Sequence, residues 1–528
     1  MNERPHLAKT YPANIKTLKA SAAAAILVYL ASGVSQLAIA QQAGAGGEAS
    51  VPAFAPGMIN HMQAMRRFKD ADHGAQPAPA VIPRFEIDRN PGGAIATFQP
   101  GVATFPFNNA FFQNLGTNGR TCFTCHQPQS GWTVGSADVA ARFAASAGTD
   151  PIFRLVDGAT CPSANVSTLA AKRRAYALLI EKGLIRIGLP MPAGANFQVI
   201  SVNDPYNCTT NPATGLTSPT SGIVSMYRRP LPSTNLGFLS TIMWDGREPS
   251  LASQAKDATL GHAQADTAPS DAQQAQMVAF ESGIFTAQEI DRKAGRLHDD
   301  GATGGAVALS LQLSNFFIGV NDPLGNNPQN VPFTPNIFDL FKPWLGLRGG
   351  GDDVRQRLSI ARGEEIFNTT KINITGVGGL NDALNITSIP GFCGTCHDTP
   401  NVGNHSVKAP LNIGVADAGA KSPPGLDISE LPVFTLKCAD GPLAAPDGPL
   451  AGNVFTVTDP GRALITGKCA DIGKVKGPIL RGLAVRAPYF HNGSASTLLD
   501  VVNFYDQRFG LRFTEQQKSD LVNFLNAL

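Results

Sequence analysis

The chain has 528 residues, of which 43% are hydrophobic and 16% charged, and its formal net charge is +2. This length predicts two or three globular domains with their own cores and excludes a small electron carrier. Residues 1–40 hold four Lys/Arg and one Asp/Glu, so the remainder has 38 basic and 39 acidic side chains. This balance argues against nucleic acid as a partner.

The first 40 residues have the order of a secretory signal. Four basic residues come first, the apolar run "AAAAILVYLASGV" follows, and the small-residue site Ala38-Ile39-Ala40 ends the segment. This order predicts export to a Gram-negative-type periplasm, with a retained membrane anchor as the alternative. No later stretch is long and apolar enough to span a bilayer, so no membrane span is expected after signal cleavage. Residues 41–83, rich in Ala, Gly and Pro, are expected to form a linker or leader strap.

The spacing Cys-x-x-Cys-His occurs twice, in "RTCFTCHQPQSGW" and in "GFCGTCHDTPNVG". It is the attachment site of c-type haem, in which two thiols bond to the haem vinyls and the adjacent imidazole ligates the iron. A redox disulfide or half of a zinc site is the alternative for one copy, but neither copy has a second Cys-x-x-Cys at zinc-finger distance. The sequence therefore predicts two covalently bound haem c groups, held by Cys122, Cys125 and His126 and by Cys393, Cys396 and His397.

The other four cysteines are expected to oxidise in an exported protein. We favour the local pairs Cys161–Cys208 and Cys438–Cys469, with free buried thiols as the alternative.

The two motifs predict a mainly α fold of two cytochrome c-like haem domains. The first is expected at 84–345, with a loop-rich insertion at about 133–228, and the second at 346–528. Strand-like stretches are few. Thr514 and Gln517 form a capping signature ahead of an apolar stripe, which predicts a terminal helix.

The sixth ligand of each iron separates an electron carrier from a catalyst. For the second haem, no methionine follows Met277. A helix that begins after Thr497 would turn Tyr505 inward, either as a ligand or merely as part of the core. The candidate ligands after Gly350 are His405, His491, Tyr489 and Tyr505.

In the first half, "MWDGREPSLASQAKDATLGHAQ" predicts a helix that begins at Ser250 and carries Gln254 on an apolar face. Gln254 would face a haem-bound ligand or bond nearby backbone. His262, near the helix end, would be a distal acid–base group, an iron ligand, or a charge that favours the helix dipole.

These residues resemble the bacterial dihaem cytochrome c peroxidase and MauG family. The resemblance rests on the two haem motifs, on "MWDGREPSLASQA" and on "LRGLAVRAPYFHNGSASTLLDVVNFY", and covers about two-thirds of the chain. It implies that the His126 haem is peroxidatic and the His397 haem relays electrons. It further implies that Trp244 lies between the haems, that Gln254 is the distal glutamine and that Tyr505 is an axial ligand.

Two departures from this family concern the first haem. Gln264 stands where the peroxidases have a distal glutamate, which makes His262 the nearest substitute. No histidine lies between Trp132 and Trp244, where resting peroxidases have a blocking ligand, so an open iron is expected. The resemblance also implies a calcium ion between the domains, near Asn235 and Pro488.

The expected function is that of a periplasmic dihaem oxidoreductase that reacts with hydrogen peroxide, or dioxygen, at the first haem. A small redox protein, a quinol, or an organic or protein substrate would supply the electrons. The alternatives are a dihaem electron-transfer cytochrome and a dihaem oxygenase that uses dioxygen.

Overall fold

The computed structural model describes residues 78–208, 223–440, 450 and 452–528, all within one compact unit, Met62–Leu528. The predicted signal at 1–40 and most of the linker at 41–83 lie outside the described residues. Of the linker, residues 78–83 are described, and Ile82 is buried and paired with Thr104 in a β-bridge. The domain boundaries at 84–345 and 346–528 stay predictions.

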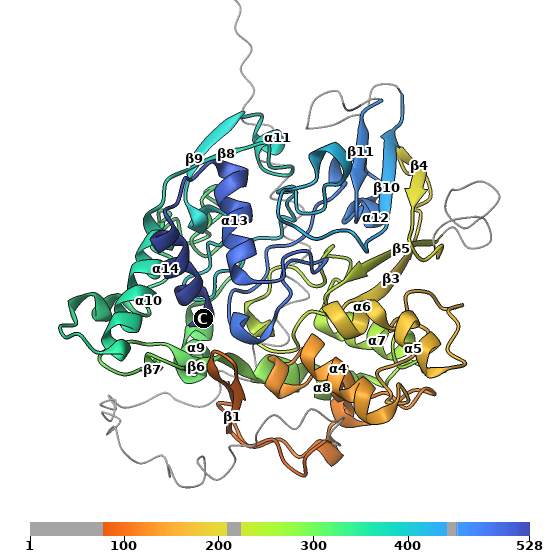
Figure 1. Cartoon of the computed structure of the whole chain (residues 1–528), viewed down its shortest axis with the longest axis horizontal. Coiled ribbons are helices and arrows are strands. Elements are labelled where there is room, and N and C mark those ends of the chain that lie inside the picture. The colour runs from red at the N-terminus through yellow and green to blue at the C-terminus, as the bar shows by residue number, and fades with distance from the viewer. Residues whose placement is uncertain (1–77, 209–222, 441–449, 451) are drawn as a thin grey trace, which may run out of the picture. The chain divides into compact units, whose positions relative to one another are not determined.

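The helices alternate with short strands along the chain (Figure 1). The α-helices are α3 (Cys122–Cys125), α4 (Ser136–Ser146), α5 (Leu169–Ala175), α6 (Ala177–Lys182), α7 (Leu251–Gly261), α8 (Asp271–Gly283), α9 (Gly305–Leu311), α10 (Asp352–Thr369), α11 (Asn381–Leu384), α12 (Ala463–Thr466), α13 (Leu498–Phe509) and α14 (Glu515–Asn526). The strands are β1 (Phe85–Asn90), β2 (Gly93–Phe98), β3 (Ile185–Pro190), β4 (Phe197–Asn203), β5 (Ile223–Arg228), β6 (Phe285–Asp291), β7 (Gly295–Arg296), β8 (Ile372–Thr375), β9 (Ser388–Gly391), β10 (Val433–Cys438) and β11 (Val454–Val457).

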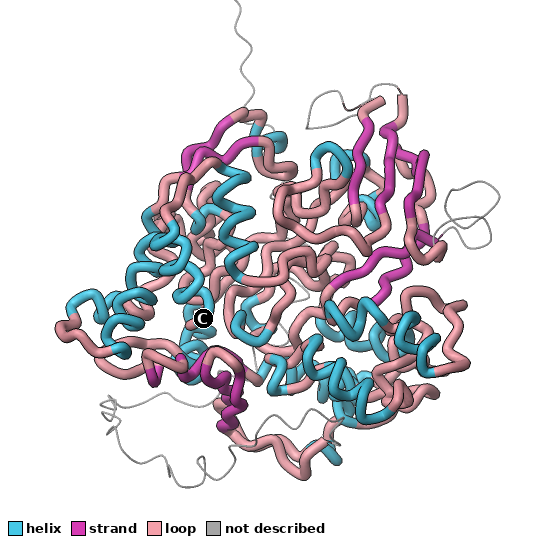
Figure 2. Tube along the Cα trace, viewed as in Figure 1, coloured by secondary structure: helices cyan, strands magenta, loops and turns pink. Residues whose placement is uncertain are grey.

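The expectation of a mainly α fold is wrong. Helices take up 33% of the described residues and strands 17%, and the strands form several sheets. The strand orders are β1-β2-β6-β7, β11-β10-β4, β3-β5 and β8-β9. Long loops connect these elements (Figure 2). The segment 133–228 is not simply loop-rich either, because its described residues form α4 to α6 and β3 to β5.

Sequence periodicity does not predict these strands, because they are short and most of their pairing partners are distant in the sequence. The hairpin β1–β2 carries a local signal, since Pro91 and Gly92 turn the chain between the paired residues Asn90 and Gly93. The β6–β7 pairing is also local, since Asp291 pairs with Gly295, but β2–β6, β3–β5 and β4–β10 join distant segments. The strand β4 pairs with β10, which follows it by more than 200 residues, and no pattern within either strand indicates that partner.

The segment 133–228 is joined to the second half by this β4–β10 pairing. Both local disulfides are formed, with Cα–Cα distances of 5.4 Å for Cys161–Cys208 and 5.7 Å for Cys438–Cys469. Cys438 lies on β10, so the second disulfide crosses the shared core. The segment therefore packs against both halves of the chain.

The C-terminal helices form a separate core. The helices α10, α13 and α14 group together in Figure 1, away from the sheet of β4, β10 and β11. Thr514 and Gln517 form the predicted capping box at the start of α14. The helices α10 and α14 approach so closely that a Cβ on Gly363 would lie 2.1 Å from the Asp520 carbonyl oxygen. A glycine is required at that crossing.

Candidate haem and redox sites

Two cavities carry the two Cys-x-x-Cys-His motifs on their walls. The His126 cavity, which contains His126, Cys122 and Cys125, has a volume of about 1540 Å³, part of it open to solvent. The His397 cavity, which contains His397, Cys393 and Cys396, has a volume of about 1550 Å³. Apolar side chains line most of both. The two cavities are similar in size and carry the same attachment residues. Each therefore fits the same kind of prosthetic group.

Both motif histidines have the tautomer that an iron ligand needs. His126 Nδ1 lies 2.8 Å from the carbonyl oxygen of Trp132, and His397 Nδ1 lies 2.7 Å from that of Gly403. A carbonyl can only accept, so Nδ1 carries the proton and Nε2 keeps its lone pair. Burial lowers the pKa of His126 to about 4, which keeps the ring neutral. Each imidazole is oriented as a neutral Nε2 ligand.

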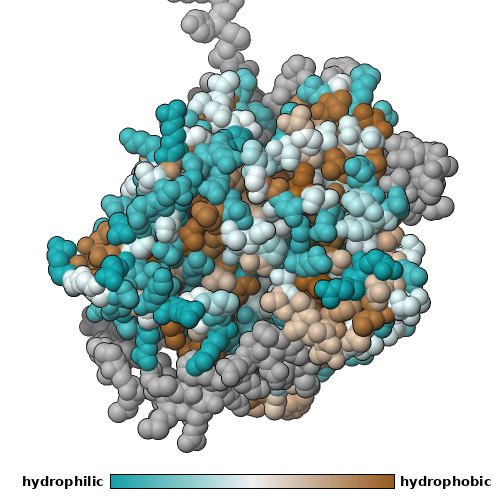
Figure 3. Space-filling model, in the orientation of Figure 1, coloured by the Kyte–Doolittle hydropathy of each residue, from teal (hydrophilic) through white to brown (hydrophobic). Residues whose placement is uncertain are grey.

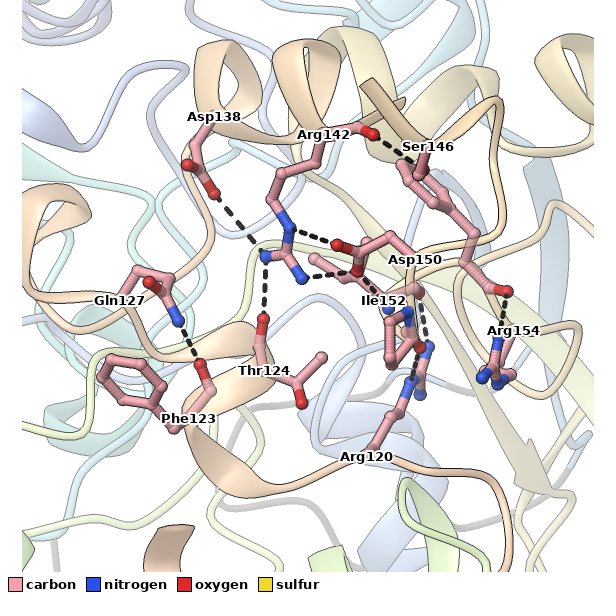
Figure 4. A network of polar contacts seen from close by, with 12 residues as sticks. Arg120, Phe123, Thr124, Gln127, Asp138, Arg142, Ser146, Asp150, Ile152 and Arg154 are labelled. Atoms are coloured by element: carbon pink, nitrogen blue, oxygen red, sulfur yellow. Dashed lines mark hydrogen bonds and ion pairs between the residues drawn. The ribbon is translucent and has the colours of Figure 1, made fainter. Parts of the chain in front are cut away.

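A buried ion network from the segment 133–228 supports the first motif (Figure 4). Arg142 forms a two-bond ion pair with Asp150, with N–O distances of 2.6 and 3.1 Å, and lies 3.6 Å from Asp138. Arg142 Nη1 also donates to the carbonyl oxygen of Thr124, between the two motif cysteines, at 2.8 Å. A two-bond Arg–carboxylate pair is rigid, so this network fixes the backbone of α3.

On the wall of the His126 cavity, α7 and its C-terminus carry Gln254 and His262. The side chain of Ser250 caps α7, as predicted, by accepting from Ser253 N. His262 Nδ1 lies 2.5 Å from Asp157 Oδ2. Arg120 Nη1 donates to the other carboxylate oxygen of Asp157 at 2.6 Å. The structure thus places Gln254 and His262 on one cavity and adds Asp157 as the partner of His262.

The charge of Asp157 is stabilised by these two neighbours. Burial acts to raise its pKa, but Arg120 and the hydrogen bond from His262 outweigh that effect and hold the pKa below its ordinary value. A carboxylate at this position fixes the protonated nitrogen of His262 as Nδ1 and leaves Nε2 free. Gln264 is exposed, and its side chain accepts from Asn118 at 3.2 Å.

Buried Lys476 and the guanidinium of Arg486, whose Nε and Nη2 atoms are buried, provide a test of whether haem fits. Lys476 lines both cavities, and Arg486 lines the His126 cavity. Neither forms an ion pair with any described residue, and Arg486 Nε and Nη2 have no hydrogen-bond partner in that part of the chain. Burial, with Arg486 nearby, lowers the pKa of Lys476 to about 7. Buried cations need anions, and the two propionates of a haem would supply them, so the residues fit the group.

In the His397 cavity, Tyr505 shares the lining with His397, and its ligation of the iron stays a prediction. Burial, followed by the Cys396 and Cys393 thiols, raises the pKa of its phenol. The other three candidates, His405, His491 and Tyr489, line the same cavity, and each histidine has a carboxylate nearby. His491 Nε2 lies 3.5 Å from Asp459 Oδ2, and His405 Nδ1 lies 3.5 Å from Asp398 Oδ1. The phenol of Tyr489, the fourth candidate, donates to the Leu483 carbonyl at 2.9 Å.

Trp244 lies on the wall of the His397 cavity, whereas its neighbour Met243 lines the His126 cavity. Its indole Nε1 donates to Arg229 O at 2.8 Å, and its carbonyl accepts from Lys476 N at 2.8 Å. Its ring meets His491 edge to face at 6.0 Å. The indole is therefore held in one orientation, and its place between two haems stays a prediction.

The turns ahead of α7 and α13 have the same backbone form. Met243 and Phe490 have left-handed φ values of 64° and 65°, and Gly246 and Gly493 follow at 67° and 66°. A β-bridge closes each turn. Such values are uncommon outside glycine, so their recurrence identifies a structural duplication of the two halves.

This duplication makes Ala258 and Tyr505 equivalent. Ser250 caps α7 and Thr497 caps α13, and Ala258 and Tyr505 each stand eighth after the cap. Ala258 lines the His126 cavity, and Tyr505 lines the His397 cavity. A methyl group cannot ligate iron. The position that offers a phenol in one cavity thus offers no ligand in the other.

Several site residues escaped sequence reasoning because tertiary packing brings them in: Asp157, Ser233, Glu281, Lys476 and Arg486. Met243 also lines the His126 cavity, and the MWDGR motif could have indicated it. The Asn235 side chain bonds both backbone groups of Thr286 at 2.9 Å. Among the described residues no cluster of three or more His, Cys, Asp or Glu could hold a metal ion. The calcium ion stays a prediction.

Comparison with known proteins supports the predicted resemblance over short segments. No family model matches the chain. The chain is 37% identical over 81 residues to the cytochrome-c peroxidase IdrP1 of Pseudomonas sp. (strain SCT). It is 42% identical over 78 residues to the cytochrome-c peroxidase IdrP2 of Denitromonas iodatirespirans. Each match covers 13% of this chain and 21% of the relative, so the chain spans about a fifth of the length of the curated relatives it matches.

Among solved structures, the chain is similar to a MauG-like protein associated with microbial copper homeostasis, with 16% identity and a TM-score of 0.34. The alignment covers 80% of this chain and 86% of that one. The resemblance to cytochrome c peroxidases is confirmed by the curated matches. None of the helices formed by described residues is long and apolar enough to cross a bilayer.

Proposed function

We propose that this chain is a periplasmic dihaem c-type cytochrome with peroxidase-like, MauG-like oxidoreductase activity. Hydrogen peroxide is the oxidant, and a small redox protein, a quinol, or an organic or protein substrate supplies the electrons. The observation that carries the proposal is the difference between the two cavities. One has Tyr505 beside its motif histidine, and the other has Ala258 at the equivalent position. An open site beside a closed one suits a catalyst that is paired with an electron relay.

Haem c bound at the two motifs would supply the iron chemistry of peroxide reduction at His126 and of electron relay at His397. The residues of the His126 cavity serve the proton chemistry. Asp157 holds the proton on His262 Nδ1, so a second proton carried on Nε2 can pass to the departing hydroxyl as the O–O bond breaks. The Gln254 amide orients the bound peroxide through a hydrogen bond.

Electrons would reach this site from the His397 side. Trp244 supports such a route because its indole lies on the wall of the His397 cavity and its neighbour Met243 lies on that of the other. Tyr505 would ligate the second iron through its phenolate oxygen. That anionic donor stabilises the higher oxidation states and excludes peroxide from the relay site.

Steady-state peroxide consumption by the holoprotein, with a panel of reduced cytochromes and quinols, tests this function. We expect peroxide-dependent oxidation of at least one donor. No donor oxidation with peroxide, together with oxygen uptake in its absence, would instead identify an oxygenase. If the holoprotein reacts with neither oxidant, it is an electron-transfer cytochrome.

A further inference from the structure

A buried carboxylate stands behind the motif histidine of the first cavity. Glu281, on α8, is 5% exposed, and its Oε2 atom has no hydrogen-bond partner among the described residues. Its neighbour Ser233, also 5% exposed, lies between it and His126. Ser233 Oγ is 3.0 Å from His126 Nδ1, and the Ser233 hydroxyl acts on Glu281 by lowering the pKa that burial raises. Three side chains from distant parts of the sequence therefore lie in a row behind the cavity.

The direction of each hydrogen bond follows from the acceptors. The Trp132 carbonyl at 2.8 Å requires the proton on His126 Nδ1. That N–H can point only to acceptors, so Ser233 Oγ accepts from it as well. The Ser233 hydroxyl hydrogen is then free to be donated to Glu281. The negative charge of the carboxylate is thus coupled through Ser233 to the ring that would ligate iron.

The second cavity lacks this arrangement in the described part of the chain. His397 Nδ1 bonds the Gly403 carbonyl at 2.7 Å. Trp132 and Gly403 stand at the same spacing after their histidines, so the carbonyl acceptor is common to both halves. Asp398 follows His397 directly, but its carboxylate accepts from the backbone N–H and hydroxyl of Ser406. The serine and carboxylate chain distinguishes the His126 site.

We propose that Glu281, acting through Ser233, is a positioning residue that strengthens His126 as an iron donor and lowers the reduction potential of the first haem. A hydrogen-bonded acceptor behind a metal-bound imidazole raises its basicity, and a stronger donor favours the ferric state. The inference rests on haem attachment at His126, as the proposed function does, but not on reaction with peroxide. It places a control of the first haem's potential on the side of its motif histidine.

The test uses the holoprotein variants Glu281→Gln and Ser233→Ala at a pH well above 7, the value near which burial places the pKa of Glu281. Spectroelectrochemistry gives the midpoint potential of each haem, and resonance Raman of the ferrous protein gives the iron–histidine stretching frequency. Both variants should raise the potential of the His126 haem and lower its stretching frequency, while the His397 haem keeps its potential. Ser233→Thr retains the hydroxyl and should resemble the wild type.

Glu364→Gln is the matched control. Glu364 is also a buried carboxylate, but it accepts from the backbone N–H groups of Leu340 and Phe341 instead of a chain to a histidine. Its substitution should leave the His126 haem unchanged. An unaltered potential and stretching frequency in Glu281→Gln would overturn the inference. This holds even if Ser233→Ala shifts both values, because Glu281 would then have no role. If the wild type does not react with peroxide, the proposed function is refuted, but the effect of Glu281 on the potential of the His126 haem is still tested.

Discussion

Asp157 Oδ2 lies 2.5 Å from His262 Nδ1, which joins the segment 133–228 to the end of α7 on the wall of the His126 cavity. The sequence places these residues in separate parts of the first half. Their contact gives the segment a place in the candidate active site, in addition to its β4–β10 pairing with the second half.

His262→Ala should lower kcat for peroxide by about 10²-fold, because the proton donor is lost. Asp157→Asn should lower kcat by about 10-fold, because the imidazole of His262 is still present but is no longer held in its orientation. Stopped-flow peroxide reduction measures both. The control is His298→Ala, since His298 pairs with Glu289 at 3.0 Å but lines neither cavity. Wild-type turnover in His262→Ala would remove the dyad from the mechanism.

Trp244→Phe should slow electron exchange between the haems and leave ligand binding at the first haem unchanged, because it alters the aromatic bridge and neither iron site. Rapid-mixing spectroscopy of the half-reduced protein follows the exchange. Trp344→Phe is the matched control, since Trp344 is buried in the C-terminal core. Equal exchange rates in wild type and Trp244→Phe would mean that another route carries the electrons.

Arg228→Leu should reduce the free energy of unfolding by about 3–5 kcal/mol, because it removes the arginine partner of buried Asp459 and leaves buried Asp245 with Arg247 alone. Arg228 lies 2.6 Å from Asp459 and 2.5 Å from Asp245, and all three are buried. Denaturant titration measures the loss. Arg355→Gln, at an exposed ion pair with Asp352, should cost under about 1 kcal/mol. Equal losses in both variants would contradict the assignment of this cluster as a structural anchor.

Ala258→Tyr should close the first site by placing a phenol where the second cavity has Tyr505. The variant should lose the rapid cyanide reaction of the first haem and peroxide turnover with it. Ala258→Phe adds similar bulk without a ligand atom and separates ligation from obstruction. Only the Tyr variant should show two low-spin ferric signals. A high-spin first haem in Ala258→Tyr would show that the two helix positions are not equivalent around their irons.

The predictions from sequence succeed where the signal is local. The caps at Ser250, Thr497 and Thr514 depend on residues a few positions apart, and each cap is present in the structure. The sequence does not predict most of the strands, because a pairing such as that of β4 with β10 is decided by tertiary packing. Ser233 and Glu281 carry no motif, and only the folded chain brings them behind His126.

Surface composition gives less information about partners. Hydrophilic residues are spread over the face shown in Figure 3, with hydrophobic residues in several separate groups.

Cyanide titration of the resting ferric holoprotein, followed by EPR in the wild type and in Tyr505→Phe, tests the central claim most directly. The claim is that the His126 haem is open and that Tyr505 closes the His397 haem. In the wild type, one high-spin signal should convert to low spin within seconds while the other haem stays unchanged. In Tyr505→Phe, both haems should bind cyanide. Two unreactive low-spin haems in the wild type, or an unchanged His397 haem in Tyr505→Phe, would contradict the account.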